Sequence, residues 1–180
     1  MRVDTGFERL VTKRLVLRRS TPEDAAMISA YRSDPDVHSQ QGWDRTDPEG
    51  VRRDIEEMSR RSPGEPGGWV QFSIEERESG GLVGDVGISP AKGEPGVIKV
   101  GYTMAPAFQG QGFGTEAVGA LVDYAFEVLG VDVVRAHASA ENAASIRVME
   151  KVGMRLIERI EHRDADGVWF GVRYERRREG

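Results

Sequence analysis

The sequence predicts a mixed α/β (α+β) fold in which a central, mostly antiparallel sheet is flanked by helices. Its 180 residues are the size of one domain. Apolar residues alternate with polar ones in several segments and recur at every third and fourth position in others, so strands and helices are interleaved. No repeat, low-complexity tract or long linker divides the chain. We therefore expect a single domain over residues 1–180.

The N-terminal part is expected to contribute one strand and two helices. Residues 10–18 have the alternating pattern of a strand. Thr21 and Asp24 have the spacing of a capping box, which predicts that a helix begins there. Residues 34–46 are expected to form a loop, and Asp47 is expected to begin the second helix.

From residue 69 the apolar period changes to two, which predicts three consecutive antiparallel strands. These strands should be followed by a long helix, one more strand, a short helix that ends at Gly153 and a closing hairpin. The expected ranges of the strands and the long helix, in order, are 69–74, 82–88, Val97–Met104, 115–129, Val133–Ser139, 154–161 and 168–174. The complete order is β-α-α-β-β-β-α-β-α-β-β, and the two strands that flank the long helix should be parallel.

The composition excludes several classes of function. Lysine and arginine number 25 and aspartate and glutamate 30, so the net charge of −5 gives no overall attraction to nucleic acid or anionic lipid. The chain has no cysteine, which excludes a disulfide scaffold, a thiolate zinc site and a cysteine nucleophile. No apolar run approaches the roughly 20 residues of a membrane helix, and the first ten residues lack a signal core. We expect a cytoplasmic protein with no metal, nucleic acid or membrane partner.

The segment most informative about function is the glycine-rich loop Gln109-Gly110-Gln111-Gly112-Phe113-Gly114-Thr115, which lies between a predicted strand and the long helix. Three glycines in five residues leave main-chain N–H groups uncovered where the helix begins. The helix N-terminus adds positive partial charge. Residues 110–115 therefore predict a phosphate or pyrophosphate site.

Three ligand classes use such loops. A Walker A loop requires a lysine that is absent here. A dinucleotide fingerprint is matched by Gly110 and Gly112 but not at its third glycine position, Thr115, and three antiparallel strands precede the loop. Asp132 does lie about 20 residues further on, so a dinucleotide-binding protein stays an alternative. The third spacing, Q/R-x-x-G-x-G, is met by Gln109, Gly112 and Gly114.

Through this third spacing and further segments in the same order, the chain resembles the GNAT superfamily of acyl-CoA-dependent N-acetyltransferases. It is most similar to the branch of RimJ/RimL-type ribosomal-protein alanine N-acetyltransferases. The similarity extends from about residue 10 to residue 174. The segments that carry it besides the loop are Arg14-Leu15-Val16-Leu17-Arg18, Ser33-Asp34-Pro35-Asp36-Val37, Leu82-Val83-Gly84, Val100-Gly101-Tyr102, Ala105-Pro106, Asn142-Ala143-Ala144-Ser145-Ile146-Arg147 and Glu150-Lys151-Val152-Gly153-Met154.

The resemblance implies an enzyme that moves an acetyl group from acetyl-CoA to a primary amine by direct attack in a ternary complex. The acceptor would be a protein N-terminus or a small-molecule amine, and a homodimer would be possible. A main-chain N–H near Met104 would stabilise the oxyanion. The cofactor-binding residues that the resemblance implies are Thr103, Met104, Ala105, Gln109, Gly110, Gln111, Gly112, Phe113, Gly114, Thr115, Asn142 and Ser145.

Two departures from the family pattern affect the expected chemistry. Met149 stands where many relatives carry a tyrosine acid, which leaves Ser145, or water, as the candidate acid. Lys99 stands where many carry a glutamate base, and a protonated lysine cannot do that work. A non-catalytic acyl-CoA-binding module is therefore a second alternative.

The base and the acceptor pocket are less well defined by the sequence. Asp85, His38 and His137 stay open as bases, with Asp85 the candidate that we name, and water could serve if the acceptor amine has a low pKa. Trp43 and His38 are expected to line the acceptor pocket.

Overall fold

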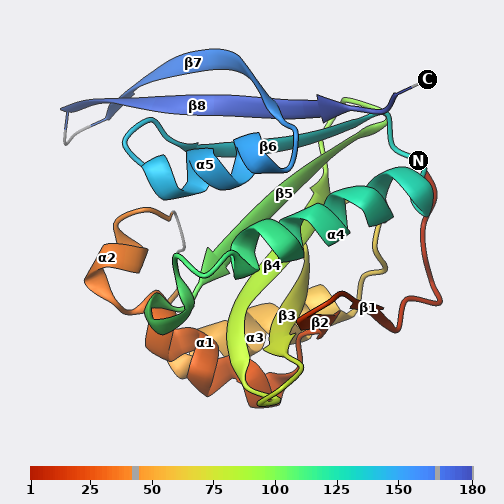
Figure 1. Cartoon of the computed structure of the whole chain (residues 1–180), viewed down its shortest axis with the longest axis vertical. Coiled ribbons are helices and arrows are strands. Elements are labelled where there is room, and N and C mark those ends of the chain that lie inside the picture. The colour runs from red at the N-terminus through yellow and green to blue at the C-terminus, as the bar shows by residue number, and fades with distance from the viewer. Residues whose placement is uncertain (42–44, 165–166, 180) are drawn as a thin grey trace.

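One mixed sheet of eight strands organises the computed structural model, which describes residues 1–41, 45–164 and 167–179 (Figure 1). The strand order is β1-β2-β3-β4-β5-β6-β8-β7, and every neighbouring pair is antiparallel except β5 and β6. The predicted α/β class is thereby confirmed. The strands are β1 (Arg9–Val11), β2 (Leu15–Arg19), β3 (Val70–Glu76), β4 (Leu82–Pro90), β5 (Val97–Met104), β6 (Val133–Ser139), β7 (Arg155–Asp164) and β8 (Gly167–Arg177).

Helices cover both faces of this sheet (Figure 1). Helix α4 runs across one face beside the shorter α5, and α1 and α3 pack together against the other face. Short 3-10 helices lie at Pro22–Asp24 and Pro106–Phe108. The α-helices are α1 (Ala25–Arg32), α2 (Pro35–His38), α3 (Pro48–Ser59), α4 (Phe113–Glu127) and α5 (Ala143–Lys151).

The two faces of the central strands differ in polarity, because successive side chains of a strand point to opposite faces. The face under α4 is apolar and belongs to the main core, with Phe72, Val86 and Val100 among its fully buried side chains. The face toward α1 and α3 carries buried polar residues at the alternate positions, among them Gln71 and Asp85. A polar surface beneath two helices is where a polar ligand can be enclosed.

Two segments differ from the prediction. Residues 10–18 do not form one strand, because the Thr12 hydroxyl accepts a hydrogen bond from the Leu15 N–H and turns the chain between β1 and β2. Residues 34–46 are not all loop, because the Asp34 carboxylate caps the short helix α2 by accepting from the Asp36 N–H. Both devices are side-chain hydrogen bonds to nearby main chain, which periodicity does not register.

Within the described ranges, no helix has the length and apolar character needed to cross a membrane.

Candidate active site

The sheet opens between β5 and β6. These parallel strands pair only through residues 97–99 with residues 133–135. Beyond that point β5 continues along β4 as far as Met104, and β6 continues along β8 as far as Ser139. The inner edges of the two strands are therefore unpaired with each other over their C-terminal halves.

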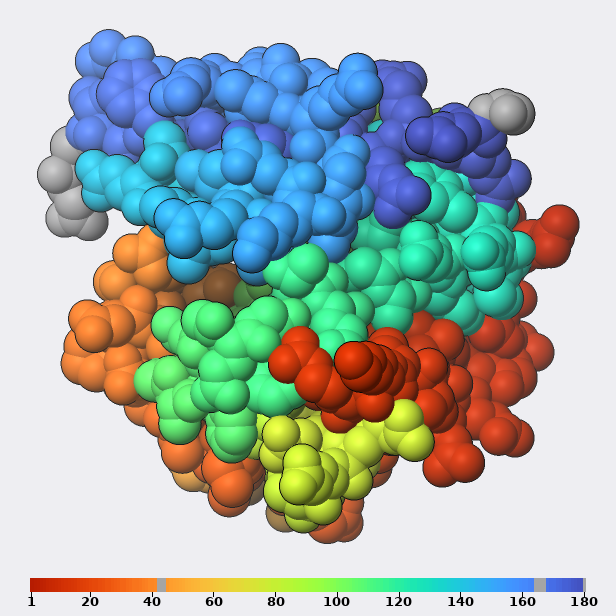
Figure 2. Space-filling model, viewed as in Figure 1, coloured from red at the N-terminus to blue at the C-terminus, as the bar shows by residue number. Residues whose placement is uncertain are grey.

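Two cavities meet at this opening. The first, which we call the glycine-loop cavity, has a volume of about 480 Å³ and lies between β5, the glycine-rich loop, α2 and the start of α5. Figure 2 shows it as a recess between the orange segment that contains α2, the green loop segment and the blue α5. The second, the polar-face cavity, has about 520 Å³ and lies between the polar face of the sheet, α1 and α3. Gln41, Tyr102 and Thr103 line both.

The glycine-rich loop has the backbone conformation that its sequence predicts. Gly110 and Gly112 have φ of +72° and +82°, in the left-handed region that glycine tolerates best. Gly112 is the N-cap of α4, so the N–H groups of residues 113–115 have no acceptor within the helix. A side chain at Gly110 would meet no atom within 4 Å, which means that this turn faces open space. The loop presents donors and a helix dipole to the cavity.

Arg14 holds this loop from behind. Its Nη1 donates to the Gln111 carbonyl at 3.0 Å, and its guanidinium lies 4.4 Å from the centroid of the buried Phe113 ring. Its Nε donates to Glu116 in the first turn of α4 at 2.7 Å. Burial alone would raise the pKa of Glu116, but hydrogen bonds from Thr12 and Arg14 outweigh it and lower that pKa. Gln111 and Phe113 thus serve the loop's structure and do not line the cavity.

The edge of β5 directs main-chain groups into the opening. The Ala105 N–H donates to Val83 on β4, so the alternation of the ladder turns Tyr102 and Met104 toward β6. Gln41 Nε2 donates to the Tyr102 carbonyl at 3.2 Å, and Gln109 Nε2 donates to the Met104 carbonyl at 3.1 Å. Thr103 and Ala105 direct their main chain toward β4 instead.

At the start of α5, Asn142 and Ser145 face Tyr102. The Asn142 carboxamide oxygen accepts from the Ser145 N–H at 2.9 Å and caps the helix. The Tyr102 hydroxyl donates to the Ser145 carbonyl at 2.9 Å and lies 2.8 Å from Ser145 Oγ. Burial raises the pKa of Tyr102 to about 12, against the opposing effect of the Ser145 hydrogen bond. The phenol is therefore protonated at neutral pH.

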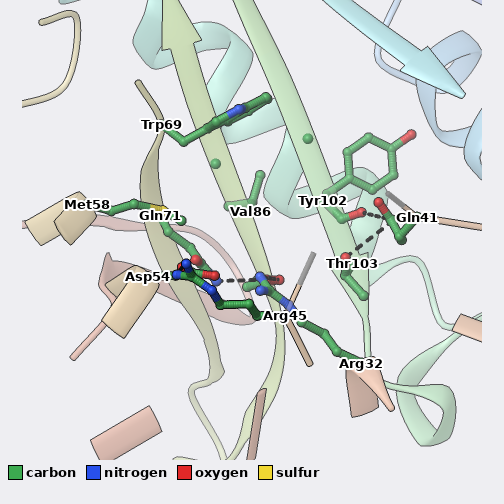
Figure 3. Close-up of a pocket in the computed structure, with 13 residues that line it drawn as sticks. Arg32, Gln41, Arg45, Asp54, Met58, Trp69, Gln71, Val86, Tyr102 and Thr103 are labelled. Carbon is green, nitrogen blue, oxygen red and sulfur yellow. Dashed lines mark hydrogen bonds and ion pairs between the residues drawn. The ribbon is translucent and has the colours of Figure 1, made fainter. Parts of the chain in front are cut away.

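The polar-face cavity is lined by paired charges and one aromatic wall (Figure 3). Arg32 Nη2 donates to the buried Asp85 carboxylate at 2.6 Å, and Gln71 Nε2 donates to the same oxygen at 2.9 Å. Arg45 pairs with Asp54 at 2.8 Å near the mouth. Figure 3 shows Trp69 over the strands on one side, while Gln41 points toward Tyr102 and Thr103 on the other.

The structure brings together most of the predicted cofactor-binding residues. Those that line the glycine-loop cavity are Thr103, Met104, Gln109, Gly110, Gly112, Gly114, Thr115, Asn142 and Ser145, whereas Ala105, Gln111 and Phe113 lie outside its lining.

The other predicted residues are more scattered. Asp85 lies in the floor of the polar-face cavity, within the ion pair described above. His38 is exposed at the end of α2, and neither His38 nor His137 lines either cavity. Trp43 lies outside the described residues. Met149 is fully buried in the core.

Sequence reasoning missed Tyr102, Arg32 and Trp69 as site residues, whereas Gln41 lies in the loop that the family resemblance places at the acceptor pocket. Of the three missed residues, only Tyr102 could have been found from sequence, since it follows Gly101 in a segment already matched to the family. Arg32 and Trp69 come from separate parts of the chain and meet only in the fold.

Comparisons with known proteins agree with this geometry. The family model for the acetyltransferase (GNAT) domain matches residues 14–155. An uncharacterized N-acetyltransferase, p20 of Bacillus licheniformis, is 31% identical over 149 residues, which cover 83% of this chain and 83% of that protein.

Solved structures share the fold. A GNAT-family acetyltransferase from Bacillus anthracis superposes with a TM-score of 0.80 at 23% identity, covering 94% of this chain and 98% of that one. Mycobacterium smegmatis RimJ in complex with CoA-disulfide superposes with a TM-score of 0.75 at 22% identity, covering 91% of this chain and 81% of that one.

The fold and the site together define an acyltransferase, in which an opened strand edge lies beside a glycine loop at a helix N-terminus. The chain belongs to the acetyltransferase (GNAT) family and has that family's N-acetyltransferase function. Enzymes of this family use acetyl-CoA as the acyl donor. Its structural neighbours include RimJ and RimL proteins, in line with the resemblance found in the sequence.

Proposed function

We propose that this protein binds acetyl-CoA in the glycine-loop cavity and transfers the acetyl group to a primary amine held in the polar-face cavity. The observation that carries the proposal is the meeting of the two cavities at Tyr102 and Thr103. A donor and an acceptor entering from opposite faces of the sheet would contact each other only there. Holding both reactants in one place supplies a large part of the rate enhancement of such a reaction.

The glycine-loop cavity fits acetyl-CoA part by part. The N–H groups at the start of α4 would hold the pyrophosphate. The pantetheine arm would lie along the β5 edge, where Tyr102 and Met104 direct their main-chain groups outward, with Asn142 across the cavity. Thr103, Met104 and Ala105 were expected to bind this arm, but of these three only Met104 directs its main-chain groups toward the open edge.

The chemistry that we propose is direct transfer. The lone pair of the neutral amine attacks the thioester carbonyl, a C–N bond forms, and the oxyanion accepts a hydrogen bond from the Met104 N–H. The C–S bond then breaks and the thiolate takes a proton from the hydroxyl pair of Tyr102 and Ser145. Because the two hydroxyls lie 2.8 Å apart, Ser145 can donate its proton to the thiolate and take one from Tyr102, whose hydroxyl then turns from the Ser145 carbonyl to Ser145 Oγ. The nitrogen gives up its extra proton to water, and solvent returns a proton to Tyr102.

In this scheme Asp85 does not act as the base. Its carboxylate is only 3% exposed and accepts hydrogen bonds from Arg32 and Gln71. Taking up a proton would weaken the pairing with Arg32 in a buried place. We therefore propose that Asp85 fixes the floor of the acceptor cavity and that solvent accepts the amine proton.

The test begins with calorimetric titration of acetyl-CoA, with NAD as the control ligand. We expect about one acetyl-CoA per chain and no heat from NAD. Thiol release from acetyl-CoA is then measured with a panel of amines and short peptides. Binding without release by any acceptor would identify a non-catalytic acyl-CoA-binding module. NAD binding would revive the dinucleotide alternative, and binding of neither ligand would remove the assignment of the loop.

We also propose that the chain forms a homodimer. Strand β7 ends the sheet and has no neighbour on its outer side among the described residues. The β7–β8 hairpin exposes large apolar side chains that include Ile157, Trp169 and Phe170. Unpaired edge strands with apolar side chains favour association. Light scattering should give twice the mass of one chain, and a monomeric mass would contradict the proposal.

A further inference from the structure

The wall of the polar-face cavity contains an aromatic platform built across three strands. Trp69 directly precedes β3, and its six-membered ring extends over Gly87 of β4 and Gly101 of β5, which are direct cross-strand partners. A Cβ at Gly87 would lie 3.3 Å from Cε3 of Trp69, and one at Gly101 would lie 3.4 Å from Cη2. The absence of side chains at both positions lets the indole lie directly on the main chain of the sheet, and a Cβ at Gly87 would make that contact tight.

The platform is available to a ligand. Trp69 lines the cavity and is 38% exposed, although a tryptophan of this size is usually more deeply covered. Met58 of α3 and the two glycines contribute further apolar surface to the same cavity. An aromatic group lying on an indole binds about two- to twelvefold more tightly than the burial of its area alone would give.

The charges around the cavity disfavour an acceptor with several positive charges. Among the described lining residues, Arg32 and Arg45 are balanced by Asp85 and Asp54, each within an ion pair. The Lys99 ammonium lies 5.5 Å from the Trp69 ring centroid and adds a positive charge on this side. A polyamine would need an excess of carboxylates to replace its hydration, and the described lining offers none.

From this geometry we infer that the acceptor is a monoamine that carries an aromatic group, with the ring on Trp69 and the amine directed at the end of β5. Within the described part of the lining, the indole of Trp69 offers a large apolar surface and both arginines are paired with carboxylates, and this combination favours an aromatic monoamine as acceptor. Gln41, Tyr102 and Thr103 mark the place where the amine would reach the thioester. The inference rests on the proposed function, since it names the acceptor class for that transfer.

Three amines distinguish an aromatic acceptor from an aliphatic monoamine and from a polyamine. Thiol release is measured at saturating acetyl-CoA with 2-phenylethylamine, n-hexylamine and spermidine. We expect kcat/KM for 2-phenylethylamine to exceed that for the other two by about tenfold, the upper part of the range for an aromatic contact. Equal or higher kcat/KM for n-hexylamine or spermidine overturns the inference while leaving the acetyltransfer itself intact. A protein that binds acetyl-CoA and acetylates none of the three overturns it as well.

Variants at Trp69 test whether this side chain causes the preference for the aromatic amine. Trp69→Ala should lower kcat/KM for 2-phenylethylamine about tenfold and that for n-hexylamine less than about threefold. Trp69→Phe keeps an aromatic surface and should retain most of the preference. The control is Val11→Ala, an exposed apolar residue of β1 that lines neither cavity and should leave all three rates unchanged. An equal loss for every amine in Trp69→Ala and Trp69→Phe would overturn the inference.

If acetyl-CoA fails to bind or no amine in the wider panel releases thiol, the proposed function fails together with this inference. If other amines turn over and the aromatic one is not preferred, this inference fails alone.

Discussion

The two cavities that meet at Tyr102 are built by different means. The glycine-loop cavity owes its binding groups mainly to main chain, namely the loop, the start of α4 and the edge of β5. The polar-face cavity owes them to side chains from α1, α3, β3, β4 and β5, together with those of Gln41 and Arg45. Main-chain N–H groups are present whatever the side chains are, so a surface made of them suits acetyl-CoA, a substrate that many enzymes share. A surface of side chains can change one residue at a time, and it is where individual acceptor preference would arise.

The largest effect should come from Asp85→Asn in the floor of the polar-face cavity. The change leaves the Arg32 guanidinium in a buried place without its carboxylate, which should lower the free energy of unfolding by about 3 kcal/mol. Urea denaturation measures this. Asp54→Asn is the matched control, because its pair with Arg45 is partly exposed and should cost less than about 1 kcal/mol. Full stability together with a large loss of kcat would instead favour Asp85 as the base.

At the junction of the cavities, Tyr102→Phe should lower kcat about 100-fold, as expected when a proton donor is lost. The Kd of acetyl-CoA should change less than about threefold, since the ring remains. Ser145→Ala should act in the same direction. Because the pKa of Tyr102 is about 12, the wild-type rate should show no alkaline loss of this acid below about pH 11. Unchanged kcat in both variants would remove the hydroxyl pair from the mechanism.

In the glycine-loop cavity, Gly114→Ala should raise the Kd of acetyl-CoA about tenfold, measured by calorimetry. The new Cβ would lie 3.4 Å from Met104 Cγ, where β5 and α4 border the cavity. Gly119→Ala is the matched control in the same helix, because its Cβ would make only an ordinary 3.8 Å contact with Val152. If both variants bind acetyl-CoA with the affinity of the wild type, acetyl-CoA does not bind in the glycine-loop cavity.

The smallest effect should come from Gln41→Ala, which touches both cavities. Its carboxamide donates to the Tyr102 carbonyl and to Thr103 Oγ1 at 3.4 Å. Losing these bonds should raise both the Kd of acetyl-CoA and the KM of the amine about threefold. Steady-state kinetics with either substrate varied tests this. An effect confined to one substrate would mean that the two cavities are more separate than their shared lining implies.

The sequence predicted the strands around the glycine-loop cavity better than any other part. Val97–Met104 and Val133–Ser139 have the predicted bounds, because each alternates clearly and is bounded by turn residues or a helix. The loop was identified because its glycines and the helix start are contiguous. Gln109 was expected among the cofactor-binding residues, but its bond to the Met104 carbonyl could not be predicted, since it depends on how the loop folds back.

The polar-face cavity was not predictable in the same way. Arg32, Trp69 and Gln71 are separated in the chain and come together only through the packing of α1 on the sheet. Besides Trp43 and His38, the local signal was the acidic residue Asp85 within a mostly apolar strand, and it was interpreted as a base. Its ion pair with Arg32 is a tertiary contact over 53 positions, which no local pattern contains.

Three residue pairs join β5 to β6, so the ladder of the sheet divides into two parts, β1–β5 and β6–β8–β7, that are paired with each other at one end. A pantetheine arm bound along the open edge would act as a short extra strand between those parts. Donor binding would then resist separation of the two parts, and its free energy would be added to that of unfolding. Amide exchange at Tyr102 and Met104 should slow when acetyl-CoA is added, and the midpoint of thermal unfolding should rise with its concentration.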